Sequence, residues 1–366
     1  MKTIKLFLLL IFTPLCFAGD VNDLIFKNDF ELVKKRIFIS GHSLMDNPYA
    51  DYLQSISTDK GLDYNWNQQI GIGSPIRVRT SGATLPDTNL WTGYLTGKNR
   101  DTFDMNIISE LANPMTIGDG ELYDSLVITE RHDILDTIMW EYSNSLLRHY
   151  HNRLLTGNPH GRTYFYQSWW NIDLSNPQEW IDHTNLEVKA YECIAQKVNL
   201  TLANDALPQV ISVIPAGTAL AYLAQEILND NVPGFVGTDF EKLDLLFNDN
   251  VHLNIEGVFY MSAVTYATLL GKSPVGADIP AGISNDTGQA LLQIAWDSVQ
   301  NYQSNFTAPS MTACRNIIET QLCPSYWSIH DQTENTAFCQ AWITDDNFLY
   351  NPFHWPDPNL LEWPDP

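Results

Sequence analysis

Two short segments carry side chains that together could cleave an ester. Gly41-His42-Ser43-Leu44 places a serine directly after an apolar run, and the segment 248–254 holds Asp249 and His252 three residues apart. A serine hydroxyl becomes a useful nucleophile when a neighbouring base removes its proton. An imidazole oriented by a carboxylate is such a base. The sequence therefore predicts a catalytic triad of Ser43, His252 and Asp249.

Each segment also has a purely structural interpretation. A serine after a strand often caps the following helix, and either Asp249 or Asn254 could cap a helix while His252 only packs beside it. The first segment is not the Gly-x-Ser-x-Gly elbow of α/β-hydrolases, because Met45 stands where the second glycine would be. The presence of both segments in one chain favours the catalytic interpretation.

The surrounding pattern predicts the elements that would position these residues. Short runs that are apolar on both faces alternate with segments of helical periodicity, which is typical of a parallel sheet covered on two sides. In such sheets ligands bind beyond the carboxyl ends of the strands. We expect strands at 36–40, 64–70, 125–129, 162–169 and 209–214, and helices at 49–58, 141–155, 185–200, 218–228 and 255–270.

The two motifs resemble the first and last conserved blocks of the SGNH hydrolases, also called GDSL-like esterases and lipases. The resemblance covers about residues 36–272. It implies a three-layer α/β/α sandwich with a parallel flavodoxin-like sheet, and a triad made by Ser43, Asp249 and His252. The aromatic run that ends in Trp169-Trp170 is expected to be strand and core, but its end falls near the rim of the predicted cleft, where a ring could stack on a sugar or an acyl group.

The resemblance also implies an oxyanion hole, built from the N–H of Ser43, a glycine after the second strand and a side chain after the third. Gly73 is our choice for the glycine, with Gly71 behind it. Where the family has Gly-x-Asn-Asp, this chain has Thr129-Glu130-Arg131-His132-Asp133, so His132 or Arg131 would be the donor. His42 also replaces a family aspartate. Arg77 could pair with Glu130 at one wall of the cleft.

The ends of the chain differ in character from its centre. Residues 1–18 have the basic start, apolar core and small-residue end of a secretory signal, and the apolar stretch is too short to span a bilayer. We assign residues 19–272 to the hydrolase-like domain, with an insertion or cap loop at 80–122. Residues 273–366 form a linker and an extension containing Cys, Trp and Pro, with a Trp-Pro-Asp-Pro unit repeated near the end.

Composition narrows the possible partners and the compartment. The formal net charge of −23 disfavours nucleic acid, which requires clustered Lys and Arg. No other segment is apolar enough to be an integral membrane span. Once the signal and its Cys16 are removed, four cysteines remain, which in a secreted or periplasmic protein form up to two disulfides with three possible pairings. A bridge from Cys314 to Cys323 or Cys339 would staple the tail. The other cysteine is Cys193.

These observations predict hydrolysis of a carboxylic ester through an acyl-enzyme, with no cofactor and no metal. The 11 Trp and 16 Tyr and the lack of an apolar lid favour acetyl esters of carbohydrates over lipid esters as substrates. The alternative is a catalytically inactive binding protein for a carbohydrate or a cell-surface partner on the same scaffold, because a fold does not fix a function.

Overall fold

A five-stranded parallel sheet forms the centre of the molecule. The computed structural model describes residues 33–82, 92–95, 97, 105–117, 120–345 and 353. The strand order is β2-β1-β3-β4-β5, which is the flavodoxin-like order. The strands are β1 (Val33–Gly41), β2 (Leu62–Ile70), β3 (Ser125–Thr129), β4 (Arg162–Tyr166) and β5 (Ile211–Ile214). The order reverses between β1 and β3, so the carboxyl ends of these two strands border the switch point where ligands bind in such sheets.

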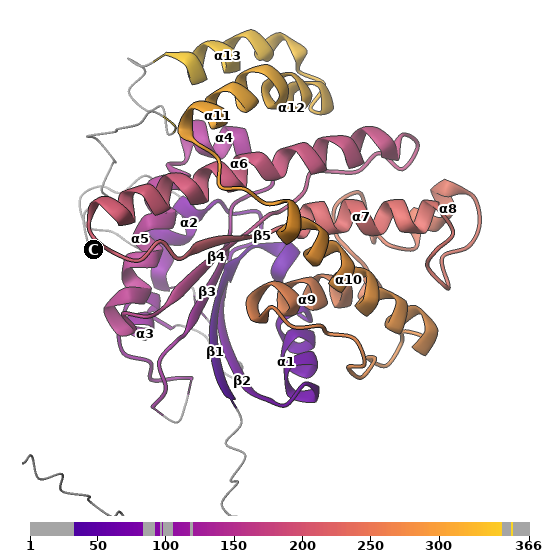
Figure 1. Cartoon of the computed structure of the whole chain (residues 1–366), viewed down its shortest axis with the longest axis horizontal. Helices are drawn as coiled ribbons and strands as arrows, with labels where there is room; N and C mark the ends of the chain where they lie inside the picture. Colours follow the sequence, from indigo (N-terminus) through magenta and orange to yellow (C-terminus); the bar gives the residue numbers. More distant parts are fainter. Residues whose placement is uncertain are drawn as a thin grey trace, which may run out of the picture.

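The sheet is apolar on both faces, as the sequence pattern predicts. Along β1, Ile37 and Ile39 contribute to one core, whereas Phe38, between them, contributes to the other. Side chains alternate across a strand, so a strand that is apolar throughout must be covered twice. The predicted three-layer α/β/α arrangement is therefore confirmed, with the sheet between two layers of helices (Figure 1).

The two layers are built from helices of unequal length. One face is covered by α1 (Tyr49–Asp59), α7 (Ala216–Leu228), α9 (Ile255–Leu270) and α10 (Asn285–Asn305), with α8 (Asp239–Asp244) beside α7. The other face is covered by α2 (Ile76–Ser81), α3 (Ile107–Ala112), α4 (Ile134–Trp140), α5 (Ser143–Gly157) and α6 (Pro177–Asn204). Helix α6 begins two turns before the predicted start, with Pro177 in its first turn, a position that suits proline.

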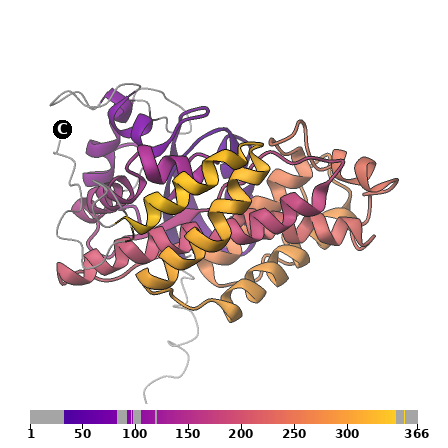
Figure 2. The same cartoon turned by 90° about the horizontal axis from the view of Figure 1, so that it is seen from above.

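The chain beyond residue 273 packs on the same cores. Leu291, Leu292 and Ala295 of α10 are buried in the core that includes α9 and α7. Next, α11 (Met311–Ile317), a π-helical segment η4 (Ile318–Leu322) and α12 (Cys323–Ile329) pack on α6 (Figures 1 and 2). A 3-10 turn η5 (Thr333–Asn335) and α13 (Thr336–Thr344) then pack on α12. The predicted extension thus contributes helices to both layers.

Two disulfides connect these helices. Cys193–Cys314 joins α6 to α11, and Cys323–Cys339 joins α12 to α13. Of the three possible pairings, the structure has the one in which Cys314 bonds to Cys193, 5.7 Å away (Cα–Cα) across the α6–α11 contact, so the bridge from Cys314 to another tail cysteine is not formed. The extension is therefore covalently tied to the sheet domain. None of the described helices is long and apolar enough to cross a membrane.

Several predicted features fall wholly or partly outside the described residues. The predicted signal at 1–18 and the Trp-Pro-Asp-Pro repeat lie outside them. The insertion expected at 80–122 is described in part, including a 3-10 turn η3 (Thr92–Leu95) and α3. Helix α3 packs on α5, and the Ile117 carbonyl accepts a hydrogen bond from Asn65 Nδ2 at 2.7 Å. This described part covers the edge strand β2.

Candidate active site

Ser43 lies at the carboxyl end of β1, as the first residue of a 3-10 turn η2 (Ser43–Met45). Two residues earlier, position 41 is a glycine because a Cβ there would lie 2.8 Å from the sulfur of the buried Met45. At the first position of a helical turn the Ser43 N–H has no acceptor within the turn. The local fold therefore presents both the hydroxyl and the N–H of Ser43 at the switch point.

His42 is a buried neutral residue that fixes this turn. Its Nε2 lies 3.1 Å from the Glu130 carbonyl oxygen and must donate, so Nδ1 is the acceptor for the Leu44 N–H at 3.5 Å. Burial, with a smaller effect of the Arg79 charge, lowers the pKa of His42 to about 3. A neutral ring can donate from one nitrogen and accept at the other. His42 thus orients Ser43 and carries no charge near neutral pH.

His252 and Asp249 reach Ser43 from the α8–α9 loop (residues 245–254). His252 Nε2 lies 2.9 Å from Ser43 Oγ, although 209 residues separate the two. On the other side of the ring, His252 Nδ1 lies 2.7 Å from Asp249 Oδ2. The three predicted triad residues are thus brought together, in the order carboxylate, imidazole, hydroxyl.

Asp249 is held as an ionised acceptor. Its Oδ1 accepts hydrogen bonds from the N–H of Val251 at 2.8 Å and of His252 at 2.7 Å. Partial burial raises the pKa of Asp249, but these two bonds and the His252 ring outweigh it and lower the pKa to about 2. The structural alternative, a helix cap, falls to Asn254, which accepts the Gly257 N–H at 3.2 Å at the start of α9.

The α8–α9 loop is fixed to the end of β4. An antiparallel bridge between Phe247 and Leu253 closes the loop. The buried Trp169 donates from Nε1 to the Val251 carbonyl at 2.9 Å, and the Ile172 N–H donates to the Asn250 carbonyl at 2.7 Å. Sequence reasoning did not assign Trp169 this role, because its partner is a backbone carbonyl far along the chain.

The predicted oxyanion donors lie in the next two loops. Gly73 is exposed in the turn after β2 with φ 62°, the left-handed region that favours glycine. His132 follows β3, and its ring centroid lies 6.3 Å from that of His42. Burial lowers the pKa of His132, so its neutral ring retains one N–H to donate. The Nε and Nη2 groups of Arg131 each donate to Asp133 at 2.6 Å, so Asp133 occupies this guanidinium.

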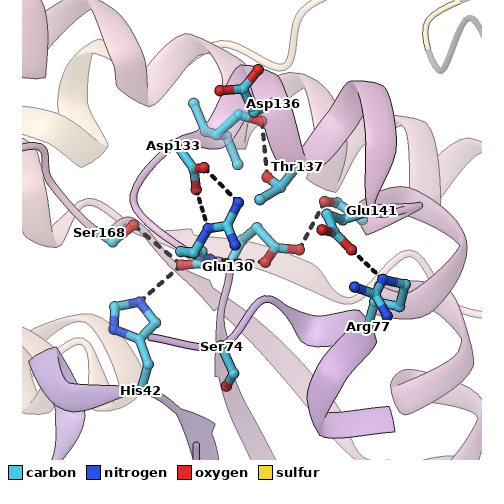
Figure 3. A network of polar contacts seen from close by, with 12 residues as sticks. His42, Ser74, Arg77, Glu130, Asp133, Asp136, Thr137, Glu141 and Ser168 are labelled. Carbon is cyan, nitrogen blue, oxygen red and sulfur yellow. Dashed lines mark hydrogen bonds and ion pairs between the residues drawn. The ribbon is translucent and has the colours of Figure 1, made fainter. Parts of the chain in front are cut away.

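Beneath these loops lies a buried carboxylate, Glu130 (Figure 3). Its Oε1 accepts the N–H of Ile76 at 2.9 Å and that of Arg131 at 2.8 Å, while Ser143 Oγ donates to Oε2 at 2.7 Å. Its carbonyl oxygen also accepts from Ser168 Oγ at 3.2 Å. Burial raises the pKa of Glu130, and the charge of Arg79 opposes that shift.

Arg79 completes this buried network and was not predicted. Its guanidinium donates to the Ser74 carbonyl at 2.6 Å, to Ser40 Oγ at 3.1 Å and to the Thr129 carbonyl. Arg79 and Glu130 thus join the ends of β1 and β3 to the turn after β2, the three segments that carry the candidate oxyanion donors. A charged residue on the buried face of a short helix after a glycine turn is the only signal the sequence gives.

The predicted Arg77–Glu130 pair is wrong. Arg77 forms an ion pair with Glu141 instead, and both are largely buried (Figure 3). Backbone N–H groups and Ser143 occupy the two oxygens of Glu130 instead. Arg77 therefore braces α2 against the end of α4.

A pocket of about 290 Å³, the Ser43 pocket, opens beside the triad. Its lining includes Ser43, Tyr52, Trp169, His252, Ile255 and Val258. The lining is mixed, because Asp46, Asn47, Asn248 and Asn254 also contribute to it. The size of the pocket lies at the lower end for small-molecule sites. Among the described residues, no group of three or more His, Cys, Asp or Glu side chains could hold a metal ion.

Comparison with known proteins bears on the fold. No protein-family model matches the chain, and no curated protein matches it. Its fold is similar to that of a DUF4886 family protein from Bacteroides uniformis, known from a crystal structure at 1.50 Å resolution, with a TM-score of 0.50 and 16% sequence identity. The match covers 75% of this chain and 98% of that one. At this identity the similarity supports the α/β/α fold alone.

Proposed function

We propose that this protein is a serine hydrolase of carboxylic esters, of the SGNH type. The observation that carries the proposal is the continuous chain of hydrogen-bonding contacts from Ser43 Oγ through His252 to Asp249, at 2.9 and 2.7 Å. Nucleophile, base and orienting group lie within the range expected of such a triad. Their position beyond the carboxyl ends of the strands, at the switch point, agrees with where such sheets bind ligands.

In the proposed mechanism, Ser43 Oγ attacks the ester carbonyl carbon while His252 Nε2 takes the hydroxyl proton. Asp249 accepts the Nδ1–H bond and stabilises the imidazolium that forms. The imidazolium returns the proton to the leaving alcohol, which gives an acyl-enzyme on Ser43. Water then attacks the acyl group with His252 again as base, and the acid is released.

The negative charge that develops on the carbonyl oxygen needs donors already in place. The N–H groups of Ser43 and Gly73 and the ring N–H of His132 are the proposed donors. A neutral His132 ring suits this role because it has one N–H to donate. Arg131 suits it less, because its guanidinium already donates to Asp133. Donors of this kind each contribute about two to three decades of rate.

The small Ser43 pocket favours a short acyl group, and acetyl esters of carbohydrates are the proposed substrates. Two disulfides support an oxidising compartment, so we propose that the protein acts outside the cytoplasm, secreted or in the periplasm.

The first test is turnover of p-nitrophenyl acetate by wild type and by Ser43→Ala. We expect the substitution to reduce kcat by at least about 10³-fold, the order of the loss when a triad member is removed. The melting temperature should change little, because Ser43 is only partly buried. Turnover that persists in Ser43→Ala overturns the proposal.

A further inference from the structure

A second hollow borders the α8–α9 loop. It has a volume of about 360 Å³ and lies between the segment that follows β4, the first turn of α6 and the end of α12. We call it the α12 pocket. The residues used below are Trp170, Asp173, Asn176, Glu179, Ser328 and Asp331, all of which line it.

The α12 pocket is close to the proposed catalytic centre. Trp169 lines the Ser43 pocket and the next residue, Trp170, lines the α12 pocket. The ring centroid of Trp170 lies 5.0 Å from that of His132. Ile172, also in the wall, is hydrogen-bonded to Asn250 of the α8–α9 loop at 2.7 Å. A substrate whose acyl group occupies the Ser43 pocket therefore has this hollow available for its alcohol portion.

The helices after residue 273 supply one wall of this pocket. The ring of His330, at the end of α12, stacks on Trp170 with centroids 3.7 Å apart. Ser328 Oγ donates to Glu179 Oε1 of α6 at 3.5 Å. Since α12 is also held by the Cys323–Cys339 disulfide, this wall is pre-formed.

The lining disfavours anionic ligands and suits a ligand rich in hydroxyl groups. Three carboxylates, on Asp173, Glu179 and Asp331, repel anions and accept hydrogen bonds from hydroxyl donors. Hydrogen bonds from Ser175 lower the pKa of Asp173, so that group is ionised. Asn176 donates to Glu179 Oε2 at 3.0 Å, which fixes the orientation of both side chains. A fixed array of acceptors beside an aromatic wall matches the chemistry of a sugar ring.

We propose that the α12 pocket is the alcohol-side subsite and binds a sugar ring of a carbohydrate ester. The proposal rests on the proposed function for the identity of the ester, but sugar binding can be measured without hydrolysis. It assigns a task to the C-terminal helices, namely that α12 helps to set which alcohol is accepted.

Asp331 allows binding and folding to be separated. Helix α12 ends with the Asp331 N–H bonded to the Ser328 carbonyl at 3.0 Å and the Gln332 N–H to the Trp327 carbonyl at 2.9 Å, with Asp331 at φ 55°. Glycine is the most favourable residue at this position of a helix end. Asp331→Gly therefore removes the carboxylate while leaving the fold at least as stable.

Ala206 provides a matched control at the end of α6. It has φ 56°, its N–H bonds to the Ala203 carbonyl at 3.1 Å, and the Leu207 N–H bonds to the Leu202 carbonyl at 2.8 Å. Ala206→Gly thus makes the same backbone change away from the pocket. Trp140→Ala is the control for Trp170→Ala, because Trp140 is exposed and contacts Phe338 of α13.

The experiment measures binding of acetylated xylo-, cello- and chito-oligosaccharides to the Ser43→Ala protein by titration calorimetry. We expect at least one series to bind, and Asp331→Gly and Trp170→Ala each to raise Kd by about tenfold or more, the loss of one good contact. Asp331→Gly and Ala206→Gly should both keep or raise the melting temperature, while Ala206→Gly and Trp140→Ala leave Kd unchanged.

Two results overturn the subsite: no binding of any series, or an equal Kd in Asp331→Gly and Ala206→Gly. Failure of the proposed function would appear in a separate measurement. Hydrolysis is measured on the protein with Ser43 intact, whereas Kd is measured on the Ser43→Ala protein.

Discussion

The ring of His42 donates to the carbonyl oxygen of Glu130 at 3.1 Å and so ties the ends of β1 and β3 together directly behind Ser43. Nδ1 of the same ring accepts the Leu44 N–H at 3.5 Å, and this second contact needs a neutral ring. A histidine can therefore stand where the SGNH hydrolases that the sequence resembles have an aspartate, and it makes the fold sensitive to acid at this position.

The first prediction concerns that sensitivity. The pKa of His42 is about 3 in the folded protein and about 6.5 when unfolded. On acidification the unfolded chain binds the proton first. The contribution of His42 to the free energy of unfolding is therefore complete above pH 6.5 and is lost as the pH drops towards 3. His42→Gln keeps a donor for Glu130 but does not titrate. Urea unfolding between pH 7 and pH 4 should show a smaller loss of stability for this variant than for wild type.

Buried His151 and His183 have pKa values lowered to about 4 and about 3, so wild type retains part of its acid sensitivity in the variant. Parallel stability curves for wild type and His42→Gln over this range would contradict the account of His42.

The second prediction concerns Asp249. Asp249→Asn leaves an acceptor for the backbone N–H groups but presents the wrong partner to His252 Nδ1, which disfavours the tautomer that can accept the Ser43 proton. We expect kcat on p-nitrophenyl acetate to fall by about 10³–10⁴-fold with KM changed less than threefold. A kcat within a factor of five of wild type would mean that the carboxylate does not orient the base.

The third prediction concerns the Arg79–Glu130 network. Arg79→Lys keeps the charge but loses the planar fork that holds the Ser74 and Thr129 carbonyls. We expect kcat to fall by about tenfold with KM unchanged, because the oxyanion donors on these segments lose their fixed positions.

Arg36→Lys is the matched control. Arg36 is also buried, but it lies on β1 and binds Asp63 far from the carboxyl end of that strand. The two variants should lose similar stability in urea, about 1–3 kcal/mol each, while only Arg79→Lys loses kcat. If Arg79→Lys and Arg36→Lys have the same kcat, the Arg79–Glu130 network stabilises the fold but does not position the oxyanion donors.

The fourth prediction compares the two disulfides. Cys193–Cys314 closes a loop of 121 residues and Cys323–Cys339 one of 16. A longer closed loop restricts the unfolded chain more, so replacing the first pair by serine should cost about 2 kcal/mol more unfolding free energy than replacing the second. Chemical unfolding of the two double variants tests this, and a larger loss for the short loop would contradict it.

Near the site, much of the structure could be predicted from sequence because the signals are local. The uniform apolar run of β3 marks a buried strand, and α9 lies between its caps, Asn254 and Gly271. Gly41 before Ser43, and Asp249 three residues before His252, are likewise short-range patterns. These are the features that a sheet with two covered faces requires.

The remaining features depend on contacts between distant segments. Arg79 is buried only because carbonyl groups from two other segments accept its hydrogen bonds, and a charged residue in a short helix otherwise indicates a surface. The pairing of Cys193 with Cys314 depends on how α11 lies across α6. Trp170 and Asp331 become neighbours of one pocket only when α12 packs beside the β4–α6 segment.

The most direct test of the central claim is the site of labelling by a fluorophosphonate, which reacts with a serine only when its hydroxyl is activated by a base. Mass spectrometry of the digested protein should place a single adduct on the peptide containing Ser43. The adduct should be absent from Ser43→Ala and slowed at least about tenfold in His252→Ala. An unlabelled wild type, or labelling that survives the loss of Ser43, would contradict the account.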